Sequence, residues 1–174
     1  MECKTERKNG RLTINIDGRN YLPLAFKTFR ASARNISDFY KAGIRLFNVL
    51  TGSIISAVGI PYSLFGETWL DDRTYDFEPI DRQIELFEAN APEGYLSIMI
   101  QLDTREWWLK KRKGYPYSFT HLAQMEADPL WRGLASEYMN AVISHVEEKY
   151  GDRVFGYFLL CGTTTEWFSR ESYE

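Results

Sequence analysis

Apolar segments of strand length alternate with amphipathic segments of helix length along most of the chain. The apolar segments, each too short to cross a membrane, cover residues 22–28, 44–50, 95–102 and 154 onward. The helical segments, with apolar positions spaced by three and four, cover residues 35–42, 77–91 and 128–151. Strands that alternate with helices predict right-handed βαβ units and a parallel sheet.

Capping and helix-breaking residues mark the ends of the predicted helices. Asn35 is expected to cap the first helix, with Asp38 at the capping-box position and Gly43 as its stop. Asp128 precedes Pro129, which suits the first position of the third helix. The buried stripe of this third helix is predicted to consist of Leu130, Leu134, Tyr138, Val142 and Val146.

A short β-hairpin is predicted before the first core strand. Residues 11–16 alternate between polar and apolar types and lead into Asp17-Gly18. This dipeptide favours a two-residue hairpin turn. The chain therefore begins with a small antiparallel element.

The connections differ in length at the two ends of the predicted parallel sheet. Helix-to-strand links are a few residues long, whereas two strand-to-helix links, 51–77 and 103–127, have roughly 25 residues each. Long loops at the carboxyl ends of parallel strands hold the functional sites of α/β barrels and doubly wound sheets. Four of the five tryptophans follow these strands, namely Trp69, Trp107, Trp108 and Trp167.

The fourth strand leads into the strongest candidate for catalysis. After its apolar residues come Gly162, three threonines, Glu166 and Trp167. An acid beside an aromatic residue at a strand tip is typical of a sugar-cleaving site, because the acid exchanges a proton with the glycosidic oxygen while the indole stacks on the sugar. The alternatives are that Glu166 is a solvated loop acid and that each tryptophan, taken singly, packs in the core. Their common placement beside several acids favours a carbohydrate cleft.

Composition narrows the function classes further. The 174 residues are 44% hydrophobic and 26% charged with a net charge of −3, which indicates a globular domain and argues against nucleic acid as a partner. The charged first eight residues contain no apolar leader, so a cytoplasmic protein without a membrane partner is expected. Two distant cysteines and the isolated His121 and His145 give no zinc spacing, so no metal or cofactor is expected.

The order of these features resembles the catalytic barrel of the clan A glycoside hydrolases, and within that clan the family-42 β-galactosidase-like enzymes. The resemblance spans nearly the whole chain and rests on residues 21–29, 35–50, 75–77 with 80–81, 100–108 and 156–168. It implies a parallel-stranded (β/α) barrel of TIM type, of which residues 1–174 hold strands one to four. The barrel is expected to continue beyond Glu174.

The resemblance also implies roles for individual residues. The clan's general acid/base is a glutamate at the end of strand four, the position of Glu166, and the nucleophilic glutamate comes from strand seven, outside this chain. The implied reaction is retaining hydrolysis of a β-galactoside-like or related oligosaccharide. Thr165 stands where many clan members have an asparagine that contacts the sugar. The residues expected to contact substrate are Trp69, Asp103, Trp107, Trp108, Thr165 and Trp167.

Two other functions fit the same sequence features. The first is a non-catalytic carbohydrate-binding half-barrel that uses the rim tryptophans as stacking platforms. The second is a phosphate-binding loop over residues 162–165, which contains no lysine and lacks the glycine spacing of a phosphate cradle. A half-barrel would leave two open strand edges, so self-association is also expected.

Overall fold

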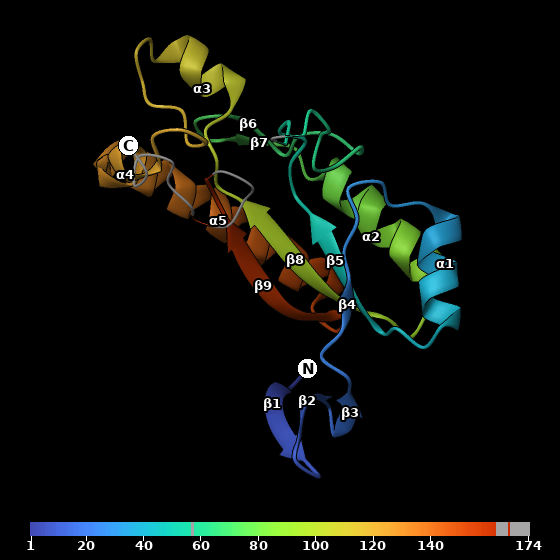
Figure 1. Ribbon diagram of the computed structural model, residues 1–174. Helices are drawn as coiled ribbons and strands as arrows, with labels where there is room; N and C mark the ends of the chain where they lie inside the picture. The colour runs from blue at the N-terminus through green and yellow to red at the C-terminus, as the bar shows by residue number, and fades with distance from the viewer. Residues whose placement is uncertain (57, 163–166, 168–174) are drawn as a thin grey trace.

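The computed structural model describes residues 1–56, 58–162 and 167 of the chain. These residues form a mixed α/β fold with a four-stranded parallel sheet, a three-stranded antiparallel sheet at the N-terminus and a two-stranded antiparallel sheet (Figure 1). The parallel strands are β4 (Ala25–Phe26), β5 (Leu46–Leu50), β8 (Tyr95–Gln101) and β9 (Val154–Leu160). The predicted combination of a parallel sheet and an N-terminal antiparallel element is confirmed.

The strands of the parallel sheet lie side by side in the order in which they occur in the chain, β4-β5-β8-β9. Strand β4 is shorter than predicted, because Pro23 has no N–H group for a ladder and Leu22 and Leu24 are 62% and 58% exposed. Strands β4 and β9 form the two edges of the sheet among the described residues.

Three helices connect the parallel strands: α1 (Ala33–Lys41), α2 (Glu78–Asn90) and α5 (Pro129–Tyr150). The N-cap predicted for α1 is wrong by three residues. Ser32 caps the helix and Asn35 is the third helical residue, whose side chain accepts a hydrogen bond from the Ser32 N–H at 3.0 Å. This reciprocal pair is a capping box, with an amide in the place of the usual Glu or Gln. Gly43 follows the helix with φ +95°, as its predicted role as the stop requires.

Helix α5 buries the predicted stripe with one exception. Leu134, Tyr138, Val142 and Val146 are buried, whereas Leu130 is 49% exposed. Trp131 takes the inward position instead. It is 5% exposed, and its indole N–H donates to the Leu102 carbonyl at 3.2 Å, which joins the start of α5 to the end of β8.

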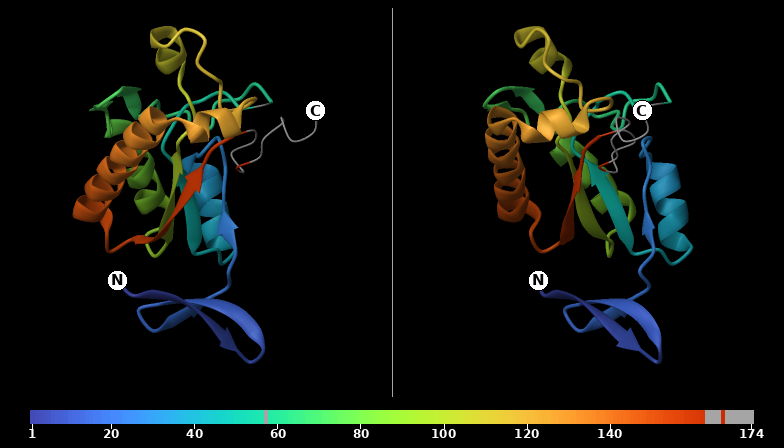
Figure 2. Two further views of the ribbon diagram at one scale, coloured as in Figure 1. Left: turned by 90° about the vertical axis from the view of Figure 1, so that its left-hand side faces the viewer. Right: turned by 60° about the vertical axis from the view of Figure 1, so that its left-hand side comes forward.

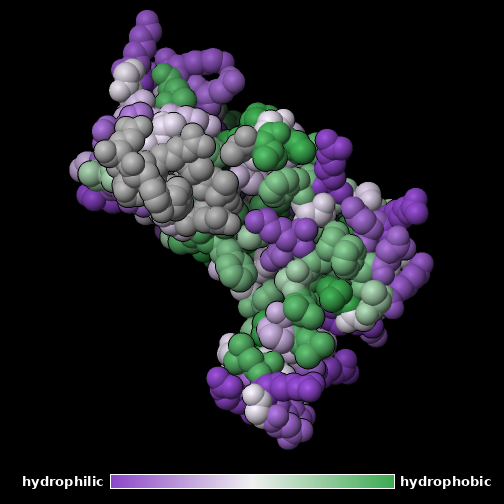
Figure 3. Space-filling view, viewed as in Figure 1, coloured by the Kyte–Doolittle hydropathy of each residue, from purple (hydrophilic) through white to green (hydrophobic). Residues whose placement is uncertain are grey.

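The larger hydrophobic core lies between the parallel sheet and the helices α2 and α5 (Figure 2), and a smaller cluster includes Leu50, Met99 and Leu160 of the strands. Ile80, Ile84 and Phe87 of α2 and the stripe of α5 pack against alternate residues of the strands. Those strand residues are Phe47, Val49, Leu96, Ile98, Ile100 and Val154. Figure 3 views the molecule from the other side of the sheet and shows hydrophobic residues together with a hydrophilic patch where the grey residues leave this side in view. Phe158 on the edge strand β9 is 49% exposed.

The N-terminal sheet consists of β1 (Cys3–Lys8), β2 (Arg11–Ile16) and β3 (Arg19–Tyr21) and lies beyond the amino-terminal ends of the parallel strands (Figure 1). The predicted turn at Asp17-Gly18 is confirmed, with φ values of 47° and 83°. A second turn at Asn9-Gly10, with φ values of 52° and 78°, joins β1 to β2. Both turns place two successive residues at positive φ, which suits a two-residue hairpin.

The two long connections leave the carboxyl ends of β5 and β8. The first contains β6 (Trp69–Asp71) and β7 (Thr74–Tyr75), and the second contains α3 (Glu106–Lys111) and α4 (Leu122–Ala127). Figure 1 shows β6, β7 and α3 at the upper edge, toward which β5, β8 and β9 point. Within the described part of the chain, no helix combines the length and apolar character needed to cross a bilayer.

Candidate functional site

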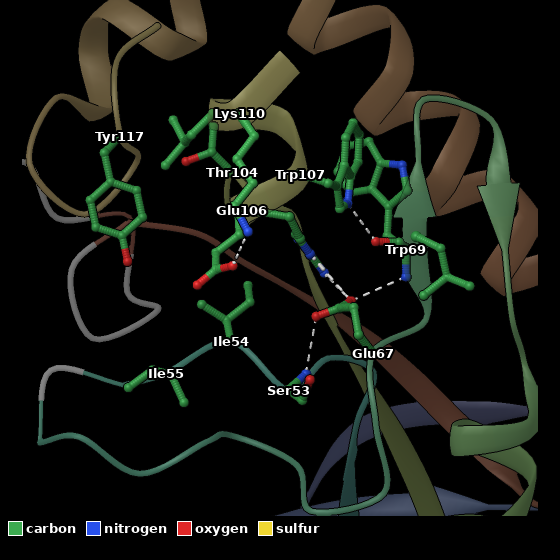
Figure 4. Close-up of a pocket in the computed structure, with 13 residues that line it drawn as sticks. Ser53, Ile54, Ile55, Glu67, Trp69, Thr104, Glu106, Trp107, Lys110 and Tyr117 are labelled. Atoms are coloured by element: carbon green, nitrogen blue, oxygen red, sulfur yellow. Dashed lines mark hydrogen bonds and ion pairs between the residues drawn. The ribbon is translucent and has the colours of Figure 1, made fainter. Parts of the chain in front are cut away.

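A pocket of about 580 Å³ lies between the two long connections at the carboxyl edge of the parallel sheet. Its walls come from residues 53–55, 67, 69–70, 104–107 and 109–110, together with Tyr117 (Figure 4). This volume is in the range of pockets that bind small molecules. The pocket therefore occupies the end of the sheet where the long loops predict a site.

The carboxylate of Glu67 forms an ion pair with Arg105 in the pocket. Its Oε1 atom accepts hydrogen bonds from Arg105 Nε at 3.2 Å and Nη2 at 3.1 Å, and from the backbone N–H groups of Thr68 and Trp69 at 3.0 and 3.1 Å. Its Oε2 atom accepts from the Ser53 N–H at 3.2 Å (Figure 4). This carboxylate therefore ties the first long connection to the second.

The Arg105 side chain is only 4% exposed and has partners on several sides. Its guanidinium lies 5.2 Å from the Trp69 ring and 5.5 Å from the Tyr138 ring, and Nη1 donates to the Asp103 carbonyl at 2.6 Å. Burial alone would lower the pKa of Arg105, but the charge of Glu67, its hydrogen bond and the nearby Tyr138 and Asp103 together outweigh burial and raise the pKa. A permanently charged guanidinium thus lies beside the pocket.

Trp107 and Tyr117 supply aromatic surface on two sides of the pocket (Figure 4). Trp107 is half-buried, and its indole N–H donates to the Trp69 carbonyl at 2.8 Å, which fixes the ring. Burial, together with the negative charge of Asp103, raises the pKa of Tyr117 to about 12, so its hydroxyl stays protonated at neutral pH. The exposed Glu106 and Lys110 form an ion pair at 2.8 Å beside them.

Two of the tryptophans that are predicted to contact substrate are buried, although Trp69 is among the residues that line the pocket. Trp69 and Trp108 are each 1% exposed, so neither ring offers a free face to a sugar. Trp69 stacks on Tyr138 with ring centroids 4.7 Å apart, and Trp108 lies 4.0 Å from the Arg112 guanidinium. Of the paired tryptophans, it is Trp107 that lines the pocket.

Asp103, which is also predicted to contact sugar, is buried and holds strand ends together. Its Oδ1 atom accepts hydrogen bonds from the Ser118 hydroxyl and from the Gly162 N–H, both at 2.8 Å, while Oδ2 has no partner in the described chain. Burial raises the pKa of Asp103. Asp103 therefore joins the end of β8 to Gly162, the second residue after β9. The preceding Cys161 is buried, as expected from the sequence for a packed thiol.

Glu166 and Thr165 lie outside the described residues, so their predicted roles stay predictions. Trp167 is described and is 42% exposed, with φ 54°. Its backbone N–H donates to the Cys161 carbonyl at 2.8 Å and its indole N–H to the Leu159 carbonyl at 2.7 Å. Trp167 therefore lies against the end of β9.

The sequence pattern contains a signal for the pocket that the prediction did not use. Gln101, Asp103 and Arg105 stand at alternate positions where an apolar strand ends, and all three are buried. Gln101 makes no side-chain hydrogen bond within the described chain, and its Oε1 lies 2.9 Å from where a Cβ would stand on Gly52. Polar residues repeated with strand periodicity indicate a polar site at a strand end.

Residues 1–56, 58–162 and 167 include no cluster of three His, Cys, Asp or Glu side chains that could hold a metal ion. The chain matches no protein-family model, and no curated protein matches it significantly.

Proposed function

We propose that this protein is a retaining glycoside hydrolase that acts on a β-galactoside-like or related oligosaccharide, with Glu166 as its general acid/base. In this proposal the parallel sheet is the first half of a TIM-type barrel, and the nucleophilic carboxylate lies outside these residues. The pocket at the carboxyl edge of the sheet carries the proposal. It combines an accessible indole, hydroxyl and carboxylate groups, and a buried guanidinium in one cavity of about 580 Å³.

The sheet topology supports a barrel-type arrangement. All four strands are parallel and follow their order in the chain, and the long connections leave their carboxyl ends. TIM barrels have this strand order and hold their catalytic groups at this end. A strand-borne acid after β9 would therefore be on the same edge as the pocket.

Hydrogen bonds hold the described residues that flank Glu166 in the sequence. The hydrogen bond from the Gly162 N–H to Asp103 Oδ1 fixes the chain four positions before Glu166. The hydrogen bond from the Trp167 N–H to the Cys161 carbonyl fixes the residue directly after it. A general acid has to be held within hydrogen-bond reach of the glycosidic oxygen, so anchors on both sides of Glu166 suit this role.

In the proposed reaction Glu166 protonates the leaving-group oxygen while a second carboxylate attacks the anomeric carbon. Glu166 then removes a proton from the water that hydrolyses the covalent intermediate. Glu67 suits neither catalytic role, because its carboxylate already accepts five hydrogen bonds.

The test compares Glu166→Gln with the unchanged sequence, both in the full-length protein that supplies the nucleophile, on two classes of substrate. Unactivated β-galactosides need an acid for departure of the leaving group, so their hydrolysis should fall by about 10²–10⁴-fold. Nitrophenyl glycosides need less help and should lose less in the glycosylation step. Glu148→Gln, on the exposed surface of α5, is the matched control and should leave both rates unchanged.

Equal rates for Glu166→Gln and the unchanged protein on both substrate classes would end the assignment. Binding of oligosaccharides without hydrolysis would favour the second candidate, a non-catalytic carbohydrate-binding protein. One observation favours that alternative: Glu67 and Asp103 both serve as acceptors that hold the two long connections and the strand ends together.

A further inference from the structure

A second pocket, of about 480 Å³, lies at the opposite end of the parallel sheet. There the N-terminal sheet approaches the starts of the parallel strands (Figures 1 and 2). Three arginines from separate segments line it: Arg19 at the start of β3, Arg45 just before β5 and Arg153 just before β9. They face two carboxylates, so the pocket is locally positive although the chain has a net charge of −3.

Neutral groups hold two of these guanidinium groups in place. Arg45 Nη1 donates to the carbonyls of Tyr40 and Ile44 at 2.9 and 3.0 Å, and the guanidinium lies 4.2 Å from the Tyr40 ring. Arg153 donates to the carbonyls of Pro92 and Ala91, and its buried Nε has no partner in the described chain. Carbonyl acceptors orient a guanidinium without cancelling its charge.

The two carboxylates of the pocket neutralise these arginines only in part. Glu93 is 73% exposed and lies 4.0 Å from Arg45 Nε, at the limit of an ion pair. Asp152 is exposed, and the ion pairs of the described residues include none that joins it to Arg19 or Arg153. The guanidinium groups of Arg19 and Arg153 therefore remain available to an anion.

Two tyrosines add hydroxyl groups to the same pocket. The rings of Tyr21 and Tyr95 meet edge to face, with centroids 5.5 Å apart. Burial raises the pKa of Tyr95, and its hydrogen bond with Tyr21 adds to this, so the hydroxyl remains a proton donor at neutral pH. The pocket thus presents neutral as well as charged donors.

We propose that this second pocket binds the phosphate group of a small molecule. A tetrahedral phosphate has oxygens for donors that approach from several directions, whereas a planar carboxylate has two. Guanidinium forks match phosphate oxygens with paired hydrogen bonds. The site is separate from the pocket at the carboxyl edge and does not depend on the proposed hydrolase activity.

The experiment titrates the protein calorimetrically with inorganic phosphate, glucose 6-phosphate and glucose, at pH 7.5 and constant ionic strength. We expect saturable binding of both phosphate compounds and none of glucose at this site. Arg19→Gln should weaken phosphate binding by about tenfold or more, because a charge-assisted hydrogen bond is lost. Tyr95→Phe removes only a hydroxyl and should weaken it less. Arg11→Gln removes the same charge from exposed β2 outside the pocket and should leave affinity unchanged.

The two phosphate compounds distinguish the possible sources of the ligand. Tighter binding of glucose 6-phosphate than of inorganic phosphate would support a phosphate ester, and equal affinity would support a site for the phosphate group alone. The proposal is overturned by the absence of saturable phosphate binding. It is also overturned if Arg11→Gln weakens binding as much as Arg19→Gln, because the attraction would then be a diffuse effect of charge.

Discussion

The Nη2 atom of Arg105 lies 3.1 Å from Oε1 of Glu67, and their side chains are 4% and 19% exposed. The two partners are not equivalent. Glu67 also accepts three backbone hydrogen bonds and borders the open pocket, whereas Arg105 is enclosed by Trp69 and Tyr138. The loss of Glu67 and the loss of Arg105 should therefore lower stability by different amounts.

Glu67→Leu should lower the free energy of unfolding by about 3–5 kcal/mol, because it leaves a buried guanidinium unpaired. Arg105→Leu should lower it by about 1–3 kcal/mol, since Glu67 keeps its backbone donors and some contact with water. Urea denaturation of both variants, and of the double variant, measures the difference. An equal cost for the two substitutions, or the reverse order, would contradict this account of the ion pair.

Gly52 lies against this ion pair, and a methyl group there should disturb it. A Cβ on Gly52 would lie 2.9 Å from Gln101 Oε1, 3.1 Å from Arg105 Nη2 and 3.2 Å from Glu67 Oε1. We expect Gly52→Ala to destabilise the fold by about 1–3 kcal/mol in thermal unfolding. Gly133→Ala is the control, because nothing lies within 4 Å of its Cβ in α5, and it should stabilise by about 0.5–1 kcal/mol.

Substitutions of the two neighbouring tryptophans of α3 should differ in their effects on stability and on ligand binding. Trp108→Ala should cost about 3–5 kcal/mol, as expected for a buried indole, and should leave a folded variant's affinity for sugar nearly unchanged. Trp107→Ala should cost about half as much, because Trp107 is half-buried, yet should weaken binding of oligosaccharides by about tenfold. Unfolding curves and calorimetric titration measure the two effects. Sugar affinity that is insensitive to Trp107 would count against the carboxyl-edge pocket as the binding site.

The pairing of Asp81 with α5 predicts a dependence of stability on pH. Asp81 Oδ1 lies 2.7 Å from His145 Nε2, and Oδ2 lies 2.6 Å from Lys149 Nζ. Burial alone would raise the pKa of Asp81, but the hydrogen bonds from Lys149 and His145 outweigh it and lower the pKa. The stability contributed by Asp81 is therefore present above its ordinary pKa of about 3.9 and is lost as pH falls through the lower folded value.

Asp81→Asn should consequently be less stable than the unchanged protein at pH 7 by about 1–2 kcal/mol, a value reduced by the exposure of Lys149. The difference should shrink below about pH 4. Chemical unfolding from pH 3 to pH 8 measures it, with Glu85→Gln on the exposed side of α2 as the control. A difference that stays constant across this range would show that the charge of Asp81 contributes nothing.

Sequence periodicity predicted most of the helices and strands because each of them buries its apolar residues at regular spacing. Residues of α5 at spacings of three and four face one core, and the apolar runs of β5, β8 and β9 are strands. The errors in the prediction occur where a single local interaction determines which residue caps a helix or faces the core. Ser32 caps α1 because its hydroxyl can pair with Asn35, and Trp131 replaces Leu130 because its indole N–H reaches the Leu102 carbonyl.

The candidate site was less accessible to prediction, because exposure and partners depend on tertiary packing. Trp107 and Trp108 are adjacent and chemically identical, but only the first lines the pocket. Their roles are set by the direction of each ring on α3. The Asn9-Gly10 turn, by contrast, could have been identified, since this dipeptide is itself a strong hairpin signal.

The order β4-β5-β8-β9 means that each strand pairs with the next parallel strand of the chain. Such a sheet can assemble by adding one strand and its helix at a time, with shorter loop closures than a shuffled order would require. Strand β8 has a hydrogen-bonded neighbour on each side, whereas β4 has two residues and a single neighbour. Amide protons of β8 should therefore be among the last in the molecule to exchange with deuterium, and those of β4 among the first of the parallel sheet.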